Sequence, residues 1–414
     1  MESDLGGNLM GESRTRDFAD GPLSGVRVVD LSAVISGPFA TAMLADQGAD
    51  VILVERADTP DIVRASGPLV PDTDISALFA SMNRNKRAIA VDLKTEPGKD
   101  VVKQLVRDAD VVVQNFRPGA LERLGMGWSV LSEINPELIM CSVSGFGQDG
   151  PYSHRPAFDP IVQSVAAYPT VQVDDGGRPN LVATAVCDKV TSMQVAQSVL
   201  AALVARANGA GGQHIELAMV DVAVHFLWPE AMWNDTYLEH QLDMPNLNEI
   251  YKLYRSSDGW VMVYSVATEA HWKNMCTALG RLDLAADPRF ADLQGRVRFG
   301  ADVNDEIQAE TSKYTTAELV ELMDRADVPV APVNTRQGMI DDPHVRHRGL
   351  LVETEHPAVG LIRQVRPPAR YSKTPTAIRR HAPSFGENTD EILRDVLGKS
   401  ADEIGLLRDC GAVL

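Results

Sequence analysis

The sequence has few cysteines, and their placement excludes the usual cysteine-based sites. The 414-residue chain contains four, Cys141, Cys187, Cys276 and Cys410, with no CxxC pair and no zinc-type spacing. We therefore expect reduced thiols, as in a cytoplasmic protein, with no disulfide framework and no metal site. Cys187 adjoins Asp188, which allows a reactive thiol, but a small buried residue is the simpler expectation.

Long apolar runs and an excess of positive charge are also absent. No run approaches the roughly 18 apolar residues that a membrane span needs. Residues 1–20 are polar and glycine-rich, without the apolar core of a signal peptide, and we predict a disordered leader. The 39 basic and 57 acidic residues give a net charge of −18. This balance argues against nucleic acid and membrane surfaces as partners, but a phosphate-bearing ligand needs only a local cationic pocket.

What the first half does contain is an alternation of short apolar strands and helices. We predict strands at 26–31, 50–55, 89–93, 110–114, 138–143 and 213–217, and helices at 39–47, 97–107 and 189–206. Such alternation indicates βαβ units in an α/β fold, with a mostly parallel sheet covered on both faces. We assign residues 21–224 to the first part of this large domain.

From about residue 225 the pattern changes, and a smaller α+β domain is predicted over 225–339. Asp258-Gly259 joins two short strands within 251–264, which is a hairpin signal, and helical patterns follow at 269–279 and 315–326. Trp228, Trp233 and Tyr237 are expected in its core, although an apolar substrate acid is the alternative explanation for them. Residues 340–414 return to the large domain through an extended connector at 361–375 and closing helices at 387–398 and 402–408.

Ligands in parallel sheets bind at the carboxyl ends of the strands. A nicotinamide dinucleotide is disfavoured there because no GxGxxG follows the first strand, although Glu55 stands where an acid could hold a ribose. Basic residues are expected near these ends, namely Arg56, Arg64, Arg84, Lys86, Arg87, Arg117 and Arg123. They indicate either a solvated charge run, above all at 83–87, or a phosphorylated ligand.

Asp188 stands where an apolar run gives way to a long helical pattern. This placement predicts a residue at the helix N-cap or in the first turn. A capping aspartate is the simplest interpretation. The alternative is a nucleophilic carboxylate at the positive end of the helix.

Several short motifs in a fixed order extend this picture over residues 21–414. They are GVRVVDL at 25–31 with Gly37-Pro38, 44–52 with Val54-Glu55, NRNKR at 83–87, NFRPG at 115–119, Asn135-Pro136, GFGQDGP at 145–151, AMVD at 218–221 and DGW at 258–260. With these motifs the chain resembles the family III coenzyme A transferases of the CaiB/BaiF type. That group also contains α-methylacyl-CoA racemases.

The resemblance implies a Rossmann-like large domain, a small domain and an interlocked homodimer. It also implies a set of contacts with coenzyme A, the expected cofactor and co-substrate. Val34 and Ile35 would lie along the CoA, Arg56, Lys86 and Arg123 near its adenosine diphosphate end, and Asn115, Phe116 and Leu124 around its nucleotide and pantetheine. Asp188 matches the catalytic aspartate of the family.

The implied reaction moves CoA from an acyl-CoA to a carboxylic acid through aspartyl anhydride and aspartyl-CoA intermediates at Asp188. A racemase is the first alternative, but racemases of this family use a His-Asp pair where this chain has Phe158-Asp159, and phenylalanine cannot move a proton. A catalytically silent CoA-binding homologue is the second. Cys187 and Ser192, which replace the usual small residue and glycine around the aspartate, motivate it.

Overall fold

The computed structural model describes residues 21–174, 176–240, 244–245, 250–264 and 268–414, so the predicted leader at 1–20 lies outside the described residues. The chain forms two compact units. The first contains residues up to 166, 181–226 and 350–414, and the second contains 167–180 and 227–349. The domain limits predicted from the sequence and the interlocked dimer stay predictions.

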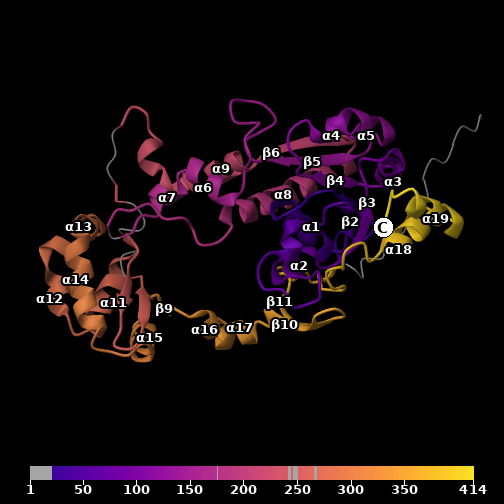
Figure 1. The fold of residues 1–414 in the computed structure, drawn as a ribbon. Coiled ribbons are helices and arrows are strands. Elements are labelled where there is room, and N and C mark those ends of the chain that lie inside the picture. The colour runs from indigo at the N-terminus through magenta and orange to yellow at the C-terminus, as the bar shows by residue number, and fades with distance from the viewer. Residues whose placement is uncertain (1–20, 175, 241–243, 246–249, 265–267) are drawn as a thin grey trace, which may run out of the picture. The chain divides into compact units, whose positions relative to one another are not determined.

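The first unit is built on a six-stranded parallel sheet in the order β3-β2-β1-β4-β5-β6 (Figure 1). Its strands are β1 (Arg27–Asp30), β2 (Asp50–Arg56), β3 (Lys86–Val91), β4 (Val111–Gln114), β5 (Ile139–Ser144) and β6 (Gln213–Ala218). Most residues of the inner strands are buried, as expected when both faces of a parallel sheet are covered. The predicted parallel sheet is confirmed, and its order is that of Rossmann folds.

Helices connect and cover these strands. Those of the first unit are η1 (Ile62–Ala65), α1 (Ser36–Asp46), α2 (Ala77–Asn83), α3 (Glu96–Arg107), α4 (Ala120–Arg123), α5 (Trp128–Ile134), α6 (Asp159–Val165) and α8 (Val186–Ala207), and α9 (Met219–Ala231) follows β6. In α3 the side chain of Thr95 caps the first turn, and Val101, Val102, Leu105 and Val106 are buried as predicted. Helix α1 begins three residues before its predicted start. Pro38 is its third residue, where a missing N–H breaks no intrahelical bond.

The C-terminal part of this unit differs from the prediction at one point. Strands β10 (Leu351–His356) and β11 (Gly360–Val365) form an antiparallel pair, so residues 361–365 are not a connector. None of residues 361–365 is a proline, so each of their backbone amides can donate a hydrogen bond to a neighbouring strand. The predicted closing helices are confirmed as α18 (Thr389–Glu391) with the π-helical turn η4 (Ile392–Val396), and as α19 (Ala401–Asp409). None of the helices within the described ranges is long and apolar enough to cross a membrane.

The second unit has its own core. The predicted hairpin is confirmed as β7 (Leu253–Arg255) and β8 (Trp260–Val263), and β9 (Val330–Pro332) completes an antiparallel sheet. Its other elements are α7 (Tyr168–Val171), η2 (Trp233–Asp235), α11 (Glu269–Ala278), α12 (Leu282–Ala286), η3 (Pro288–Phe290), α13 (Leu293–Arg298), α14 (Gly300–Thr311), α15 (Thr316–Arg325), α16 (Arg336–Asp341) and α17 (Pro343–His347). Trp228 and Tyr237 are 41% and 60% exposed, so their predicted place in the core is wrong. The core cluster is formed entirely by residues from 254 onward.

Candidate active site

A cavity of about 240 Å³ opens at the carboxyl ends of β1, β4 and β5 within the first unit. The loops that follow these strands supply most of its wall, as expected for an open parallel sheet. Its lining residues are Ala33, Val34, Ser36, Asn115, Phe116, Arg117, Pro118, Val143, Ser144, Gly145, Ser153, Arg155, Pro156, Ala157, Phe158, Asp188 and Met219. Among these described lining residues, Asp188 is the one carboxylate.

Asp188 is the third residue of α8, in the first turn, as predicted. The N-cap of α8 is Ala185, and within the described part of the chain no hydrogen bond to the Asp188 carboxylate is found, so the capping interpretation is wrong. The residue is only 7% exposed. Burial, and secondarily the charge of Asp159, raise the pKa of the Asp188 carboxyl to about 7. A carboxylate that is held in a cavity without a structural bond, and whose pKa is shifted, has the properties expected of a reacting group.

Two side chains of α6 hold the start of α8 in place. The Asp159 carboxylate accepts hydrogen bonds from the Asp188 backbone N–H at 3.1 Å and from the Gln163 amide at 2.5 Å. Gln163 also accepts from the Val182 N–H at 3.0 Å and donates to the carbonyl of Thr184 at 3.3 Å. The pair therefore fixes residues 182–188, the segment that presents the nucleophile candidate.

The residues beside Asp188 have structural roles. Cys187 is fully buried, and burial raises the pKa of its thiol to about 12, which confirms the expected buried residue and leaves little thiolate for reaction. The Ser192 hydroxyl donates to the Asp188 carbonyl at 2.9 Å, one turn back along the helix. Neither side chain lines the cavity, so these substitutions leave its wall unchanged.

A second cavity, of about 230 Å³, lies at the carboxyl ends of β1, β2 and β4. It shares Ala33, Asn115 and Phe116 with the first cavity. The Asn115 amide accepts from the Ala33 N–H at 2.9 Å and donates to the Ala33 carbonyl at 2.7 Å, which locks the two loops together. Val34 follows with a φ of 71°, strained for a β-branched residue, and its N–H donates to Asp61.

The predicted CoA contacts divide into two groups. Val34, Asn115 and Phe116 line the first cavity with Asp188, and Arg56 lines the second with Asn115 and Phe116. The others line neither cavity. Ile35 precedes the first turn of α1, Arg123 and Leu124 end the short helix α4, and Lys86 is buried.

The segment 83–87 is neither a solvated charge run nor part of the ligand edge, so both expectations for it are wrong. Residues 83–85 precede β3 and Lys86 and Arg87 are its first two residues, so the segment lies at the amino ends of the strands. The Lys86 ammonium is fully buried and donates to Asp30 at 2.9 Å, the Pro38 carbonyl at 2.9 Å and Asn83 at 2.7 Å. Arg84 and Arg87 pair with Asp46 and Asp50. These cations pair with carboxylates that are distant in the sequence, two of them buried, which sequence spacing does not reveal.

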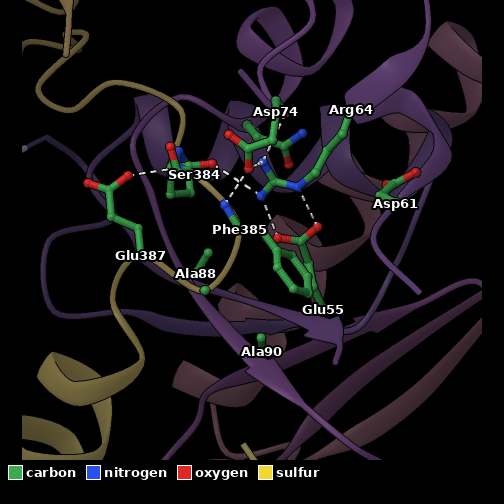
Figure 2. Close-up of polar contacts among 12 residues, drawn as sticks. Glu55, Asp61, Arg64, Asp74, Ala88, Ala90, Ser384, Phe385 and Glu387 are labelled. Carbon is green, nitrogen blue, oxygen red and sulfur yellow. Dashed lines mark hydrogen bonds and ion pairs between the residues drawn. The ribbon is translucent and has the colours of Figure 1, made fainter. Parts of the chain in front are cut away.

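Glu55 is likewise committed to a structural ion pair (Figure 2). Its carboxylate accepts from the Arg64 guanidinium at 2.8 and 2.5 Å. Arg64 also donates to Asp74 at 2.9 Å and to the Pro383 carbonyl at 3.1 Å, and the Phe385 N–H donates to Asp74. Both charges of the pair are nearly fully buried, so Glu55 is not free to hold a ribose. The geometry gives the dinucleotide hypothesis no support.

Sequence reasoning missed three residues around the site. Gln163 could have been found from its spacing, four residues after Asp159, which places both on one face of a helix. Arg155 and Tyr152 follow the GFGQDGP motif, beyond the carboxyl end of β5, where any cation is a candidate ligand contact. Among the described residues, no group of three or more histidine, cysteine or acidic side chains is arranged to hold a metal.

Comparisons with known proteins agree with this geometry. The family model described as CoA-transferase family III matches residues 23–389. The chain is 35% identical to a succinate–glutarate CoA-transferase of Agrobacterium fabrum, over 91% of this chain and 96% of the relative. It is 31% identical to a formyl-CoA:oxalate CoA-transferase of Rhodopseudomonas palustris, over 94% and 97%.

Solved structures give the same result. A CaiB/BaiF family protein from Brucella suis superposes with a TM-score of 0.80 at 30% identity, over 91% of this chain and all of that one. Rv3272 from Mycobacterium tuberculosis superposes with a TM-score of 0.80 at 29% identity, over 90% and 99%. The fold and the resemblance predicted from the sequence are confirmed. The protein is a transferase that uses CoA thioesters, and the chain belongs to CoA-transferase family III.

Proposed function

We propose that the protein moves CoA from an acyl-CoA to an acceptor carboxylic acid, with Asp188 as the covalent nucleophile. The observation that carries this proposal is the buried Asp188 carboxylate, free of any capping bond, in a cavity that adjoins a second one through Ala33, Asn115 and Phe116. Two adjoining cavities suit a long ligand whose reactive end must reach the nucleophile. CoA is such a ligand.

The first half of the reaction transfers CoA to the enzyme. An Asp188 oxygen attacks the thioester carbonyl, the C–S bond breaks, and CoA leaves as a thiolate, which produces a mixed anhydride. The thiolate then attacks the aspartyl carbonyl carbon. The anhydride C–O bond breaks, the donor acid leaves as a carboxylate, and CoA remains on Asp188 as a thioester.

The second half repeats these steps in the opposite sense. The acceptor carboxylate attacks the aspartyl-CoA carbonyl, which releases CoA thiolate and forms a new anhydride. The thiolate attacks the acyl carbon of the acceptor, and the Asp188 carboxylate is regenerated. No step consumes a proton or needs a metal, and each tetrahedral oxyanion requires nearby N–H donors.

For CoA itself we propose that the nucleotide end occupies the second cavity, near Arg56, and that the pantetheine passes Val34, Asn115 and Phe116 toward Asp188. Ile35, Arg123 and Leu124 flank this route. Lys86 acts indirectly, because its ammonium bonds Asp30 at the end of β1 and the Pro38 carbonyl in α1, the two elements that enclose the Val34 loop.

The racemase alternative finds less support. It needs a second proton-transfer group beside Asp188, and the residue at position 158, which also lines the cavity, is a phenylalanine. Asp159 is engaged by the Asp188 N–H and by Gln163. Release of an α-proton from a branched acyl-CoA into deuterated water, without any change in Asp188, would favour the racemase instead.

The proposal is tested by trapping the intermediates. Succinyl-CoA and glutarate are suitable probes, given the similarity to the Agrobacterium fabrum enzyme. We expect intact-protein mass spectrometry to show a CoA adduct after mixing with succinyl-CoA, and hydroxylamine to convert Asp188 alone into a hydroxamate. An unmodified Asp188 with every acyl-CoA tried would contradict the proposal, and CoA binding without exchange would identify a silent homologue.

The pH dependence follows from the raised pKa of Asp188. Attack needs the carboxylate, and with a pKa of about 7 we expect kcat/KM to fall by about tenfold per pH unit below that value. Asp159→Asn keeps an oxygen for the Asp188 N–H but removes the neighbouring charge, so its acidic limb should move to lower pH. Initial rates from pH 5 to 9 measure both. Asp409→Asn, on the exposed end of α19, is the matched control, and an equal shift in that variant would refute the role of Asp159.

A further inference from the structure

One guanidinium in the wall of the first cavity is oriented by aromatic contacts. The Cζ atom of Arg155 lies 3.7 Å from the centroid of the Tyr152 ring, and that ring packs edge-to-face on Phe146 at 5.7 Å. Within the described ranges, neither an ion pair nor a hydrogen bond occupies the guanidinium of Arg155. A guanidinium stacked on a ring keeps its in-plane N–H groups available, and their geometry matches a carboxylate.

The position of Arg155 separates it from the expected path of CoA. Ser153 and residues 155–158 line the first cavity but not the second. The other cation of the first cavity, Arg117, directly follows Asn115 and Phe116, the residues that both cavities share. Arg117 is therefore on the CoA side of Asp188, and Arg155 is on the side that remains for the acid.

If the acid carries two carboxylates, the negative charge around Asp188 makes a cation necessary on the acid side of the cavity. Asp188 must be ionised to react, Asp159 lies directly behind its backbone, and the chain has a net charge of −18. One carboxylate of the acid reacts with the aspartyl carbonyl. A second one would be repelled by these charges unless a positive group faced it.

We propose that Arg155 binds the non-reacting carboxylate of a dicarboxylic acid and thereby sets the specificity of the enzyme. The inference rests on the proposed function, since it assigns the acid side of the same cavity. Tyr152 orients the guanidinium and the chain length of the acid spans the distance to Asp188. A monocarboxylic acid of equal length places a methyl group against Arg155 and loses this contact.

The experiment compares glutarate with valerate, two five-carbon acids, as acceptors from one acyl-CoA donor. Because the donor is common, any effect on its binding cancels in the ratio of the two kcat/KM values. We expect the wild-type protein to favour glutarate, and Arg155→Gln to lower that ratio by about 10- to 100-fold, mainly through KM. Arg155→Lys should retain part of the preference, because it keeps the charge but not the two-pronged geometry.

Two controls keep the outcome interpretable. Arg325→Gln removes an exposed arginine of α15 and should leave the ratio unchanged, and the melting temperature of Arg155→Gln should match that of the wild type. Equal losses with both acids, or a wild-type enzyme that does not distinguish them, overturn the role of Arg155 alone. An Asp188 that acyl-CoA never modifies overturns the proposed function as well. A modified Asp188 that transfers CoA to valerate but not to glutarate overturns only the inference.

Discussion

Replacement of Asp188 by asparagine should abolish CoA transfer and at the same time stabilise the folded protein above pH 7. The amide is nearly isosteric, so the cavity and its CoA contacts stay intact. It cannot form the anhydride, so we expect kcat to fall by at least about 10³-fold, as when other covalent nucleophiles are removed. Product formation from acyl-CoA measures the loss, and isothermal titration with CoA should show binding within a few-fold of the wild type.

The stability change follows from the same pKa. The Asp188 carboxyl titrates near 7 in the folded protein and near 3.8 when unfolded, so ionisation is resisted only in the folded state. Below about pH 4 both states are protonated and nothing is lost. Stability then falls as pH rises toward 7, and the cost is complete above that value. At about 1.4 kcal/mol per pKa unit, its upper limit is about 4 kcal/mol.

The comparison that checks this point uses two pH values. Asp188→Asn should melt at a higher temperature than the wild type at pH 8, and the gain should be only about a quarter as large at pH 4.5. Asp409→Asn, which alters an exposed carboxylate, should match the wild type at both. A melting-temperature gain of equal size at the two pH values would mean that the amide packs better, and that ionisation of Asp188 has no part in it. In that case the ionised carboxylate that the reaction needs would not lower the stability of the folded protein.

The sheet could be predicted from the sequence because its strands are apolar runs at regular spacing. The prediction missed the start of β3 because its first residues are not apolar. Lys86 and Arg87 are charged, and their burial depends on Asp30 and Asp50, which are distant in the sequence. The pairing of β10 with β11 was hidden in the same way. Its strands alternate weakly, and a nearby run of prolines and arginines resembles a linker.

In the candidate site too, features that depend on the local sequence could be predicted, and features that depend on distant residues could not. Asp188 was found because a carboxylate between an apolar run and a helix is a local pattern. Its unusual pKa was not predictable, since it arises from burial and from Asp159, 29 residues earlier. Arg56 and Lys86 are both basic residues at the end of a strand, yet Arg56 lines a cavity and Lys86 is buried. Arg56 lies at the carboxyl end of β2 and Lys86 at the amino end of β3. Only the register of the sheet determines these positions.

Lys86→Met should be among the most destabilising single substitutions in the chain. The side chains of Lys86 and Asp30 are both 0% exposed, and among the described residues the other donors to the Asp30 carboxylate are Ser32 and Thr41. Removing the ammonium leaves a buried carboxylate without a counter-charge, which costs about 3–5 kcal/mol. Lys94→Met is the matched control. Its ammonium is 68% exposed and bridges Asp58, so we expect a change of at most about 1 kcal/mol.

The double variant decides whether the cost comes from the unpaired charge. In Lys86→Met/Asp30→Asn the carboxylate is gone as well, so much of the lost stability should return, as judged by chemical denaturation of all variants at one protein concentration. The double variant should still bind CoA more weakly than the wild type, because nothing then ties the end of β1 to the Pro38 carbonyl beside the Val34 loop. If Lys86→Met and Lys94→Met unfold alike, the ammonium does not compensate Asp30. If the double variant is no more stable than Lys86→Met, the lost bonds to Pro38 and Asn83 dominate, and Lys86 holds the loops in place chiefly through those two contacts.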